Sequence, residues 1–289
     1  MITHLDCMPC FLQQALKCSD ILNLSAENSK RVIDQVALTI PHLSMEKSPP
    51  FNSRLIYDAI ISITGIEDPF LPIKNDSNQQ ALQLYPTAKQ MVIDSPDPLL
   101  TAIHIAAAGN VIDYGTTQTI SSITAAFQNA LKQPFSVFCF DSFKKRLKTA
   151  NNILILGDNA GEIVFDRLLI ETINKPVTYA VRGLPIINDA LRKDAIDVGI
   201  DQIATLIDNG SGYPGTVLEK CSQNFKDVFN QSDLIISKGQ GNFESLCDIK
   251  GPVCMIFMVK CRQVVQHVQT LYQPAPPVQT GNFVLACPE

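Results

Sequence analysis

The sequence contains no tryptophan, only 14 glycines among its 289 residues, and only 18% charged residues. The low glycine content argues against collagen-like and low-complexity chains. Because no run of 18 or more apolar residues occurs, the sequence predicts no transmembrane helix. The first residues, MITHLDCMPCFLQQ, carry acidic, amide and cysteine side chains where a signal peptide needs cations followed by an apolar run. We therefore expect a soluble, cytoplasmic globular protein with no membrane partner.

Charges of neither sign are in large excess. The chain has 23 Lys and Arg against 28 Asp and Glu, which gives a formal net charge of −5. No basic stripe stands out, so the sequence argues against nucleic acid as the main partner.

Nine cysteines occur without a secretory signal, so we expect reduced thiols and not a disulfide framework. Most are expected in the core, among them Cys139, Cys221, Cys247 and Cys254. Cys7 and Cys10 form a Cys-x-x-Cys pair with three interpretations: packing, which we favour, a redox dithiol, or zinc binding with distant partners. The candidate zinc partners are Cys261 and His4. The remaining histidines share no ligand spacing with His4 and are interpreted as structural or surface residues, namely His42, His104 and His267.

The first half of the chain predicts helices. Apolar residues recur at three- and four-residue spacings over 4–20, 26–40, 53–63, 77–93, 98–112 and 117–131. Ser25 is the expected N-cap of the second of these helices.

After about residue 150, short β-rich runs alternate with helical stretches. The runs cover 152–156, 177–181, 203–207, 234–237, 253–259 and 283–286, and the helical stretches include 162–174 and 187–198. Apolar strands that alternate with helices are typical of a parallel sheet covered on both faces. We predict an α/β fold in which an all-helical N-terminal subdomain (1–150) precedes a Rossmann-like three-layer α/β/α domain (151–289) with a mostly parallel sheet.

Ligands of such sheets bind at the carboxyl ends of the strands. Three loops follow predicted strands there: GDNAGE at 157–162, RGLPIIND at 182–189 and KGQGNFE at 238–244. Asp158, Asn159 and Asp189 offer hard oxygen ligands for a divalent cation, although Asp158 and Asp189 could instead cap the helices that follow. Lys238, followed by two glycines, fits phosphate binding, although the same pattern occurs in ordinary turns with a solvated lysine.

These segments, in this order and spacing, resemble the metal-dependent damage-control phosphatases. CMPC at 7–10, GIEDPF at 65–70 and AGNVIDYG at 108–115 belong to the same pattern, and the cysteine pair resembles the compact microbial branch. The eukaryotic relatives are sugar-phosphate phosphatases that have also been described as acidic-residue methyltransferases. They are far longer than this chain, so their specificity is not transferred.

The resemblance implies the two-part fold described above and one divalent cation (Mn, Co, Ni or Mg). It places the metal ligands at Asp158, Asn159 and Asp189. We expect Asp158 and Lys238 to be catalytic, and the resemblance places the family's phosphate-binding lysine at Lys238. Six further residues lie in matching motifs and are expected to bind substrate, namely Asn110, Asp113, Glu162, Arg182, Asn242 and Glu244.

We accordingly expect an enzyme that hydrolyses a small phosphorylated metabolite by metal-activated water. One alternative is a carboxyl methyltransferase that uses S-adenosylmethionine, but an acid directly after the first strand, without a Gly-rich turn, fits that cofactor poorly. A second alternative is a non-catalytic protein that sequesters a phosphometabolite. Phosphate release with and without divalent metal, measured in the absence of a methyl donor, distinguishes the three.

Overall fold

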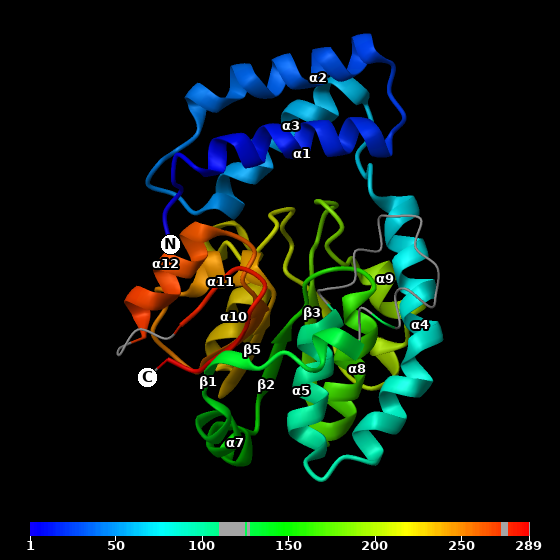
Figure 1. Cartoon of the computed structure of the whole chain (residues 1–289), viewed down its shortest axis with the longest axis vertical. Helices are drawn as coiled ribbons and strands as arrows, with labels where there is room; N and C mark the ends of the chain where they lie inside the picture. Colours follow the sequence, from blue (N-terminus) through cyan, green and yellow to red (C-terminus); the bar gives the residue numbers. More distant parts are fainter. Residues whose placement is uncertain (110–124, 126–127, 273–276, 289) are drawn as a thin grey trace.

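The computed structural model describes residues 1–109, 125, 128–272 and 277–288. Three helices at the amino-terminal end, α1 (Cys7–Ile21), α2 (Ala26–Thr39) and α3 (Pro49–Thr64), pack against one another around their own apolar core. Ser25 caps α2 as predicted, because its side chain accepts a hydrogen bond of 3.3 Å from the Asn28 amide. Figure 1 shows these helices as a layer, called here the cap, at one end of the molecule.

A seven-stranded sheet forms the centre of the remaining chain. Its strands are β1 (Phe135–Phe138), β2 (Ile153–Leu156), β3 (Val177–Val181), β4 (Thr205–Asp208), β5 (Leu234–Lys238), β6 (Val253–Met258) and β7 (Phe283–Ala286). The order is β1-β7-β6-β5-β2-β3-β4. The five strands from β6 to β4 are parallel, β7 runs antiparallel to β6, and β1 runs parallel to β7.

Helices cover both faces of the sheet, because alternate strand residues point to opposite sides. Ile153 and Ile155 of β2 join one core, whereas Leu154 and Leu156 join another. The first core includes α4 (Leu71–Ile93), α5 (Pro98–Ala108), α7 (Phe140–Thr149), α8 (Glu162–Ile173) and α9 (Arg192–Asp197). The second includes α10 (Gln223–Gln231), α11 (Gln240–Leu246) and α12 (Arg262–Leu271). The mostly parallel three-layer architecture predicted from the sequence is therefore confirmed.

The sheet begins earlier in the chain than the sequence pattern predicts. β1 lies at 135–138, and α4 and α5 pack on α8 although they precede residue 150. The division into domains at residue 150 stays a prediction. The helix predicted over 187–198 is shorter, because the chain turns at Ile187 with a φ of 41° before α9 begins. The helix predicted over 117–131 lies largely outside the described residues.

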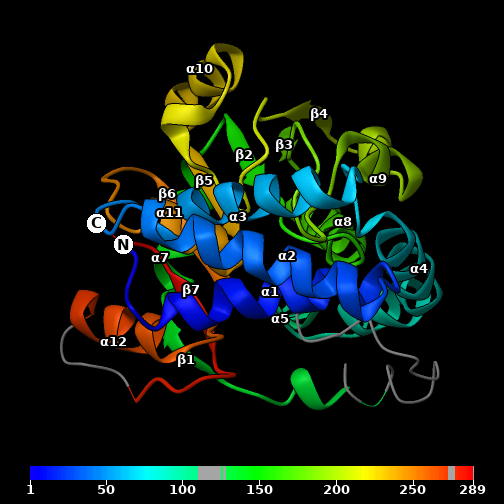
Figure 2. The same cartoon turned by 90° about the horizontal axis from the view of Figure 1, so that it is seen from above.

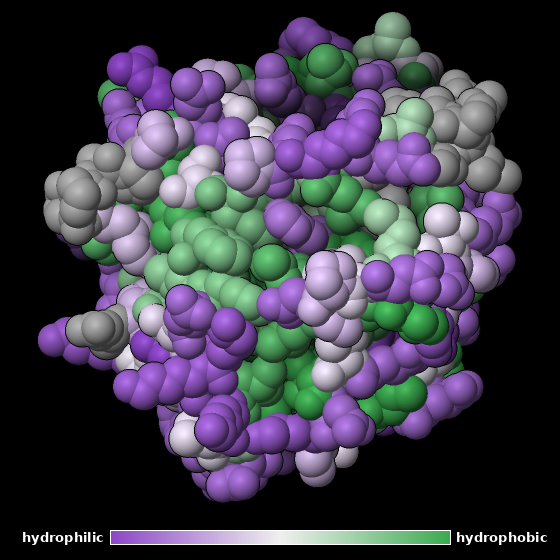
Figure 3. All heavy atoms as spheres, turned by 60° about the horizontal axis from the view of Figure 1, so that its bottom comes forward, coloured by the Kyte–Doolittle hydropathy of each residue, from purple (hydrophilic) through white to green (hydrophobic). Residues whose placement is uncertain are grey.

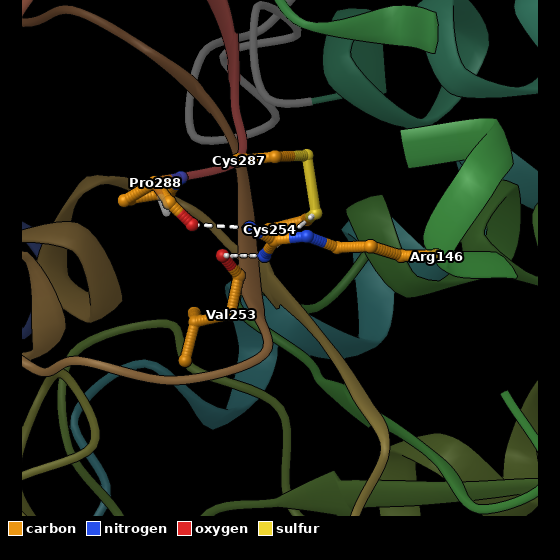
Figure 4. Close-up of a disulfide and its surroundings, with 5 residues drawn as sticks. All are labelled: Arg146, Val253, Cys254, Cys287 and Pro288. Carbon is orange, nitrogen blue, oxygen red and sulfur yellow. Dashed lines mark hydrogen bonds between the residues drawn. A yellow bond between two sulfur atoms is a disulfide. The ribbon is translucent and has the colours of Figure 1, made fainter. Parts of the chain in front are cut away.

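The expectation that all cysteines are reduced thiols is wrong for one pair. Cys254 and Cys287 form a disulfide, with their Cα atoms 4.3 Å apart (Figure 4). Since Met255 pairs with Ala286 in the antiparallel ladder, Cys254 and Cys287 lie directly opposite each other. They are 33 residues apart in the sequence, so only the pairing of β6 with β7 reveals that they are neighbours.

Figure 3 shows one face on which hydrophilic side chains surround and interrupt hydrophobic ones. Among the described helices, none combines the length and apolarity that crossing a membrane requires.

Candidate active site

A cavity of about 430 Å³ lies between the cap and the loops that follow the parallel strands. α1 and α3 supply one wall, and Figures 1 and 2 show the cap lying across that edge of the sheet. The opposite wall comes from the loops after β2, β3, β5 and β6. Polar residues of this wall are Asp158, Asn159, Asn188, Asp189, Gln240, Glu244, Lys260, Arg262 and Gln263.

The cavity lies beside the point where the strand order reverses. From β2 the chain proceeds to β3 and β4 on one side, whereas β5 pairs with β2 on the other side and leads to β6. Loops at such a switch point diverge and leave room for a ligand. Here the loops after β2 and β5 also lie in close contact at Gly239 and Asp158. A Cβ atom added to Gly239 would lie only 1.9 Å from Asp158 Oδ2. Gly239, with a φ of 82°, is therefore required beside Asp158.

The three predicted metal ligands meet in this cavity. Asp158 Oδ2 accepts a hydrogen bond of 2.8 Å from Asn159 Nδ2, and Asn159 and Asp189 form an isolated backbone bridge. The amide of Ala190 donates to the Asp158 carbonyl at 2.8 Å, which ties the two loops together. Neither acid caps a helix, because the N-caps of α8 and α9 are Gly161 and Leu191. The capping interpretation of Asp158 and Asp189 is therefore wrong.

Burial opposes the ionisation of both carboxyl groups. Burial, together with the nearby charge of Asp189, raises the pKa of Asp158 to about 6, although Lys260 and Arg182 act in the opposite direction. Burial likewise raises the pKa of Asp189, and Arg182 opposes this shift. Two buried acids that repel each other, together with the Asn159 carboxamide, form a set of oxygen donors that a hard divalent cation would stabilise. The donor chemistry therefore fits the metal that the family resemblance implies.

Arg182 and Asn242, predicted to bind substrate, instead hold the loops in place. The Arg182 Nε atom donates to Asp189 Oδ2 at 2.6 Å, and its NH2 group donates to Asn242 Oδ1 at 3.2 Å. Asn242 Nδ2 in turn donates to the Lys238 carbonyl at 2.7 Å. Both side chains are buried, and neither is among the cavity-lining residues. We interpret them as positioning residues for Asp189 and for the loop after β5.

Lys238 does not reach the cavity either. Its ammonium group is buried and donates to Asp166 Oδ1 at 2.6 Å, Glu162 Oε1 at 2.8 Å and the Ala106 carbonyl at 2.9 Å. Burial lowers the pKa of Lys238, but the two carboxylates outweigh this effect and raise it. All three donors of the ammonium group are thus engaged inside the protein. This arrangement departs from the predicted phosphate contact, since a strand-end lysine points into the core between β5 and α8.

The other predicted substrate-binding residues divide into three groups. Glu162 is buried and accepts from Lys238, and burial raises its pKa to about 7. Glu244 of α11 lines the cavity and accepts a hydrogen bond of 2.7 Å from Gln240, and its contact with substrate stays a prediction. Asn110 and Asp113 lie outside the described residues.

Sequence reasoning missed Lys260, a cationic residue that lines the cavity together with Arg262. This residue follows β6 after Val259, its side chain is exposed, and it lines the cavity with Asp158 and Asp189. Its charge lowers the pKa of both acids, which shows that it lies within electrostatic range of them. The position of Lys260 directly after a predicted strand was the available signal, since β6 ends at the same edge as β2 and β5.

A second group of possible metal ligands lies elsewhere in the described chain. Single ligand atoms of Cys247, Asp248 and His267 lie within 4.8 Å of one another. The amino group of Met1 already occupies this cluster, at 3.1 Å from Cys247 Sγ and 2.9 Å from Asp248 Oδ2. A cation is therefore present there without a metal ion. None of the three residues lines the cavity between the cap and the sheet.

Comparison with known proteins agrees with this architecture. Residues 3–273 match the model of the damage-control phosphatase ARMT1-like domain. The chain is 32% identical to an uncharacterised protein of Methanocaldococcus jannaschii, over 91% of this chain and 90% of that protein. It is 34% identical to a damage-control phosphatase of Archaeoglobus fulgidus, over 76% and 80%.

The fold is also found in a solved structure. A crystal structure of a DUF89 family protein from Pyrococcus horikoshii superposes with a TM-score of 0.89 at 26% identity, and the match covers all of both chains. The family match covers most of the sequence, and the matched range includes the predicted site residues of the sheet loops. The chain therefore belongs to the damage-control phosphatase family defined by the ARMT1-like domain.

Proposed function

We propose that this protein is a metal-dependent phosphatase that hydrolyses small phosphomonoesters, such as sugar phosphates or damaged phosphometabolites. The observation that carries the proposal is one cavity in which the oxygen donors Asp158, Asn159 and Asp189 face the same space as the Lys260 ammonium group. Catalysis of phosphoryl transfer requires positive groups that stabilise the negative charge on the phosphoryl oxygens. In this cavity the proposed metal and Lys260 would supply them.

Different residues would bind the metal, bind the phosphoryl group and position the ligands. Asp158, Asn159 and Asp189 would hold one divalent cation (Mn, Co, Ni or Mg), which supplies charge neutralisation and a bound water of lowered pKa. Lys260 binds the remaining phosphoryl oxygens with a charge-assisted contact. Arg182 orients Asp189 through its 2.6 Å hydrogen bond, while Gln14 of α1 contacts the organic part of the substrate.

The cap gives the reaction a partly enclosed space. Residues of α1 and α3, including Phe11, Pro49 and Pro50, form the wall opposite the metal ligands. A cavity of about 430 Å³ holds a small metabolite but not a macromolecule. Exclusion of water by this wall strengthens the electrostatic interactions with the phosphoryl group.

Phosphate release from p-nitrophenyl phosphate and from a panel of sugar phosphates tests the proposal. The purified, chelator-treated protein is assayed alone and with Mn²⁺, Co²⁺, Ni²⁺ or Mg²⁺, in the absence of a methyl donor. We expect turnover only with metal, and its loss in Asp158→Asn, which removes a full charge from the ion's ligands. Tight binding of phosphometabolites without turnover would instead indicate a sequestering protein, and a requirement for S-adenosylmethionine would indicate a methyltransferase.

A further inference from the structure

The cavity contains a second set of donors, which are sulfur atoms. Cys7 and Cys10 lie in the first turn of α1, and Cys261 follows β6 in the loop that leads to α12. All three line the cavity, and all three are free thiols. The proposed phosphatase reaction uses none of them.

The two segments that carry these thiols are held together. Gln263 Nε2 of α12 donates to Asp6 Oδ2, directly before α1, at 2.6 Å. Figure 2 shows the start of α1 beside α12. Residues i and i+3 of a helix face the same side, so Cys7 and Cys10 can present their sulfurs together.

A buried carboxyl group lies beside the thiols. The carboxamide nitrogen of Gln240 contacts Glu244 Oε1 at 2.7 Å and Cys261 Sγ at 3.9 Å, which places these two groups close together. Burial raises the pKa of Cys7 and Cys10, and the negative charges of Glu244 and Cys261 raise it further. The three thiols and the Glu244 carboxyl group therefore line the same cavity, and a cation among them would relieve the repulsion between their anionic forms.

We propose that Cys7, Cys10 and Cys261 bind one thiophilic divalent ion of the zinc class, with Glu244 as the fourth ligand. Three thiolates with one histidine form a common tetrahedral zinc set, and a carboxylate oxygen is also a zinc ligand, so Glu244 can take the fourth position. Thiolates select zinc-like ions, whereas carboxylate and carboxamide oxygens suit Mg²⁺ and Mn²⁺. The cavity thus holds two sites that differ in donor softness.

Binding changes the protonation and the conformation of the ligands. The three thiols release three protons when they coordinate the ion, so the affinity rises with pH. No three of the four donor atoms lie within 4.8 Å of one another, so the side chains must rotate inward around the ion. The bound ion would then join α1 of the cap to the β6–α12 loop and close one side of the cavity.

Cobalt absorption tests this site directly, because Co²⁺ bound to thiolates gives charge-transfer bands that oxygen ligands do not give. Chelator-treated, reduced protein is titrated with Co²⁺. We expect one equivalent to produce the thiolate band, and we expect Cys261→Ser and Cys10→Ser to abolish it. Asp189→Asn, which alters only the oxygen site, and Cys247→Ser, which alters the cluster around Met1, should retain it.

Absence of the band in the wild type, or its persistence in both cavity variants, overturns the proposal. Loss of the band in Cys247→Ser alone would move the site to the Met1 cluster and would also overturn it. If a serine variant fails to fold, alkylation of the wild type with and without Cd²⁺ replaces it. Cd²⁺ should protect Cys7, Cys10 and Cys261 at least tenfold, and equal labelling would contradict the site. The test does not measure phosphatase turnover, so its outcome is independent of the proposed function.

Discussion

The two lysines at strand ends have opposite environments. Lys238 is buried against Glu162 and Asp166, whereas Lys260 is exposed in the cavity. The Lys-Gly-x-Gly pattern in the sequence favours phosphate binding by Lys238. The direction of the Lys238 side chain, however, depends on the packing of α8 against the sheet. Side-chain direction at a strand end is thus a tertiary property, and sequence pattern alone does not determine it.

We expect Lys260→Ala to lower kcat/KM for phosphomonoesters about ten- to a hundredfold. A charge-assisted contact is worth about 1.5–3 kcal/mol, and about 1.36 kcal/mol corresponds to a factor of ten in rate. The free energy of unfolding should change little, because the side chain is exposed. Steady-state kinetics with Mn²⁺ and urea unfolding measure the two effects.

Lys238→Ala is the matched variant, and we expect it to reduce stability. It leaves Glu162 and Asp166 buried without their cation, which costs about 3–5 kcal/mol in comparable cases. Urea unfolding measures this loss. A stable Lys238→Ala protein, combined with a Lys260→Ala protein of wild-type kcat/KM, would return the phosphate contact to Lys238.

Glu244 should make stability depend on pH. Burial raises its pKa from the usual 4.5 to about 7. The folded state therefore binds the proton more tightly than the unfolded state, and this group stabilises the protein fully below pH 4.5. Its contribution falls as the pH rises from about 4.5 to about 7 and amounts to about 3 kcal/mol in total.

We expect Glu244→Gln to lose less stability than the wild type between pH 5 and pH 8. The difference between the two proteins in urea unfolding, with chelator present, isolates this group from the other acids. Parallel pH profiles for the two proteins would show that Glu244 ionises normally in the folded state.

At the scale of the elements, the loop after β2 restricts which residue can occupy the turn between β5 and α11. Gly239→Ala would place a methyl group against the Asp158 carboxylate and would strain a φ of 82°. We expect the variant to bind Mn²⁺ at least tenfold more weakly, because Asp158 must move. Isothermal titration calorimetry measures the change.

Gly251→Ala provides the control for backbone strain. Gly251 also has a positive φ, of 149°, but no atom lies within 4 Å of the position of an added Cβ. This variant should keep the Mn²⁺ affinity of the wild type. Equal loss of affinity in both variants would mean that strain, and not contact with Asp158, causes the effect.

The disulfide between Cys254 and Cys287 should stabilise the antiparallel edge of the sheet. Closing a loop over a sequence separation of 33 residues is worth about 3–4 kcal/mol in the chain-entropy description. We expect Cys287→Ser to lower the free energy of unfolding by up to that amount under oxidising conditions. Cys139→Ser, which alters a free cysteine, should change it little.

Reduction supplies the second measurement for this bond. Dithiothreitol should lower the stability of the wild type and leave Cys287→Ser unaffected. A wild type that is equally stable with and without dithiothreitol would show that the bond contributes nothing under these conditions.

At the scale of the whole molecule, the sequence predicts the layers better than the lining of the site. Six of the seven strands and the edge that carries Asp158 and Asp189 follow from the apolar runs and from what comes after them. β1 was missed because FSVF lies outside the alternating second half of the chain. The cap wall and the Cys254–Cys287 pairing depend on contacts between distant segments, which local periodicity does not encode.

The metal site should couple to the stability of the whole fold. Asp158 and Asp189 come from two loops that meet only in the folded protein, so Mn²⁺ binds the folded state in preference to the unfolded chain. At a hundredfold excess over the dissociation constant, such binding stabilises by about 2.7 kcal/mol. We expect Mn²⁺ to raise the unfolding temperature of the wild type but not of Asp189→Asn. Lys260→Ala should still be stabilised by Mn²⁺, because it leaves all three proposed oxygen ligands in place. Equal stabilisation of the wild type and Asp189→Asn would place the Mn²⁺ site elsewhere in the protein.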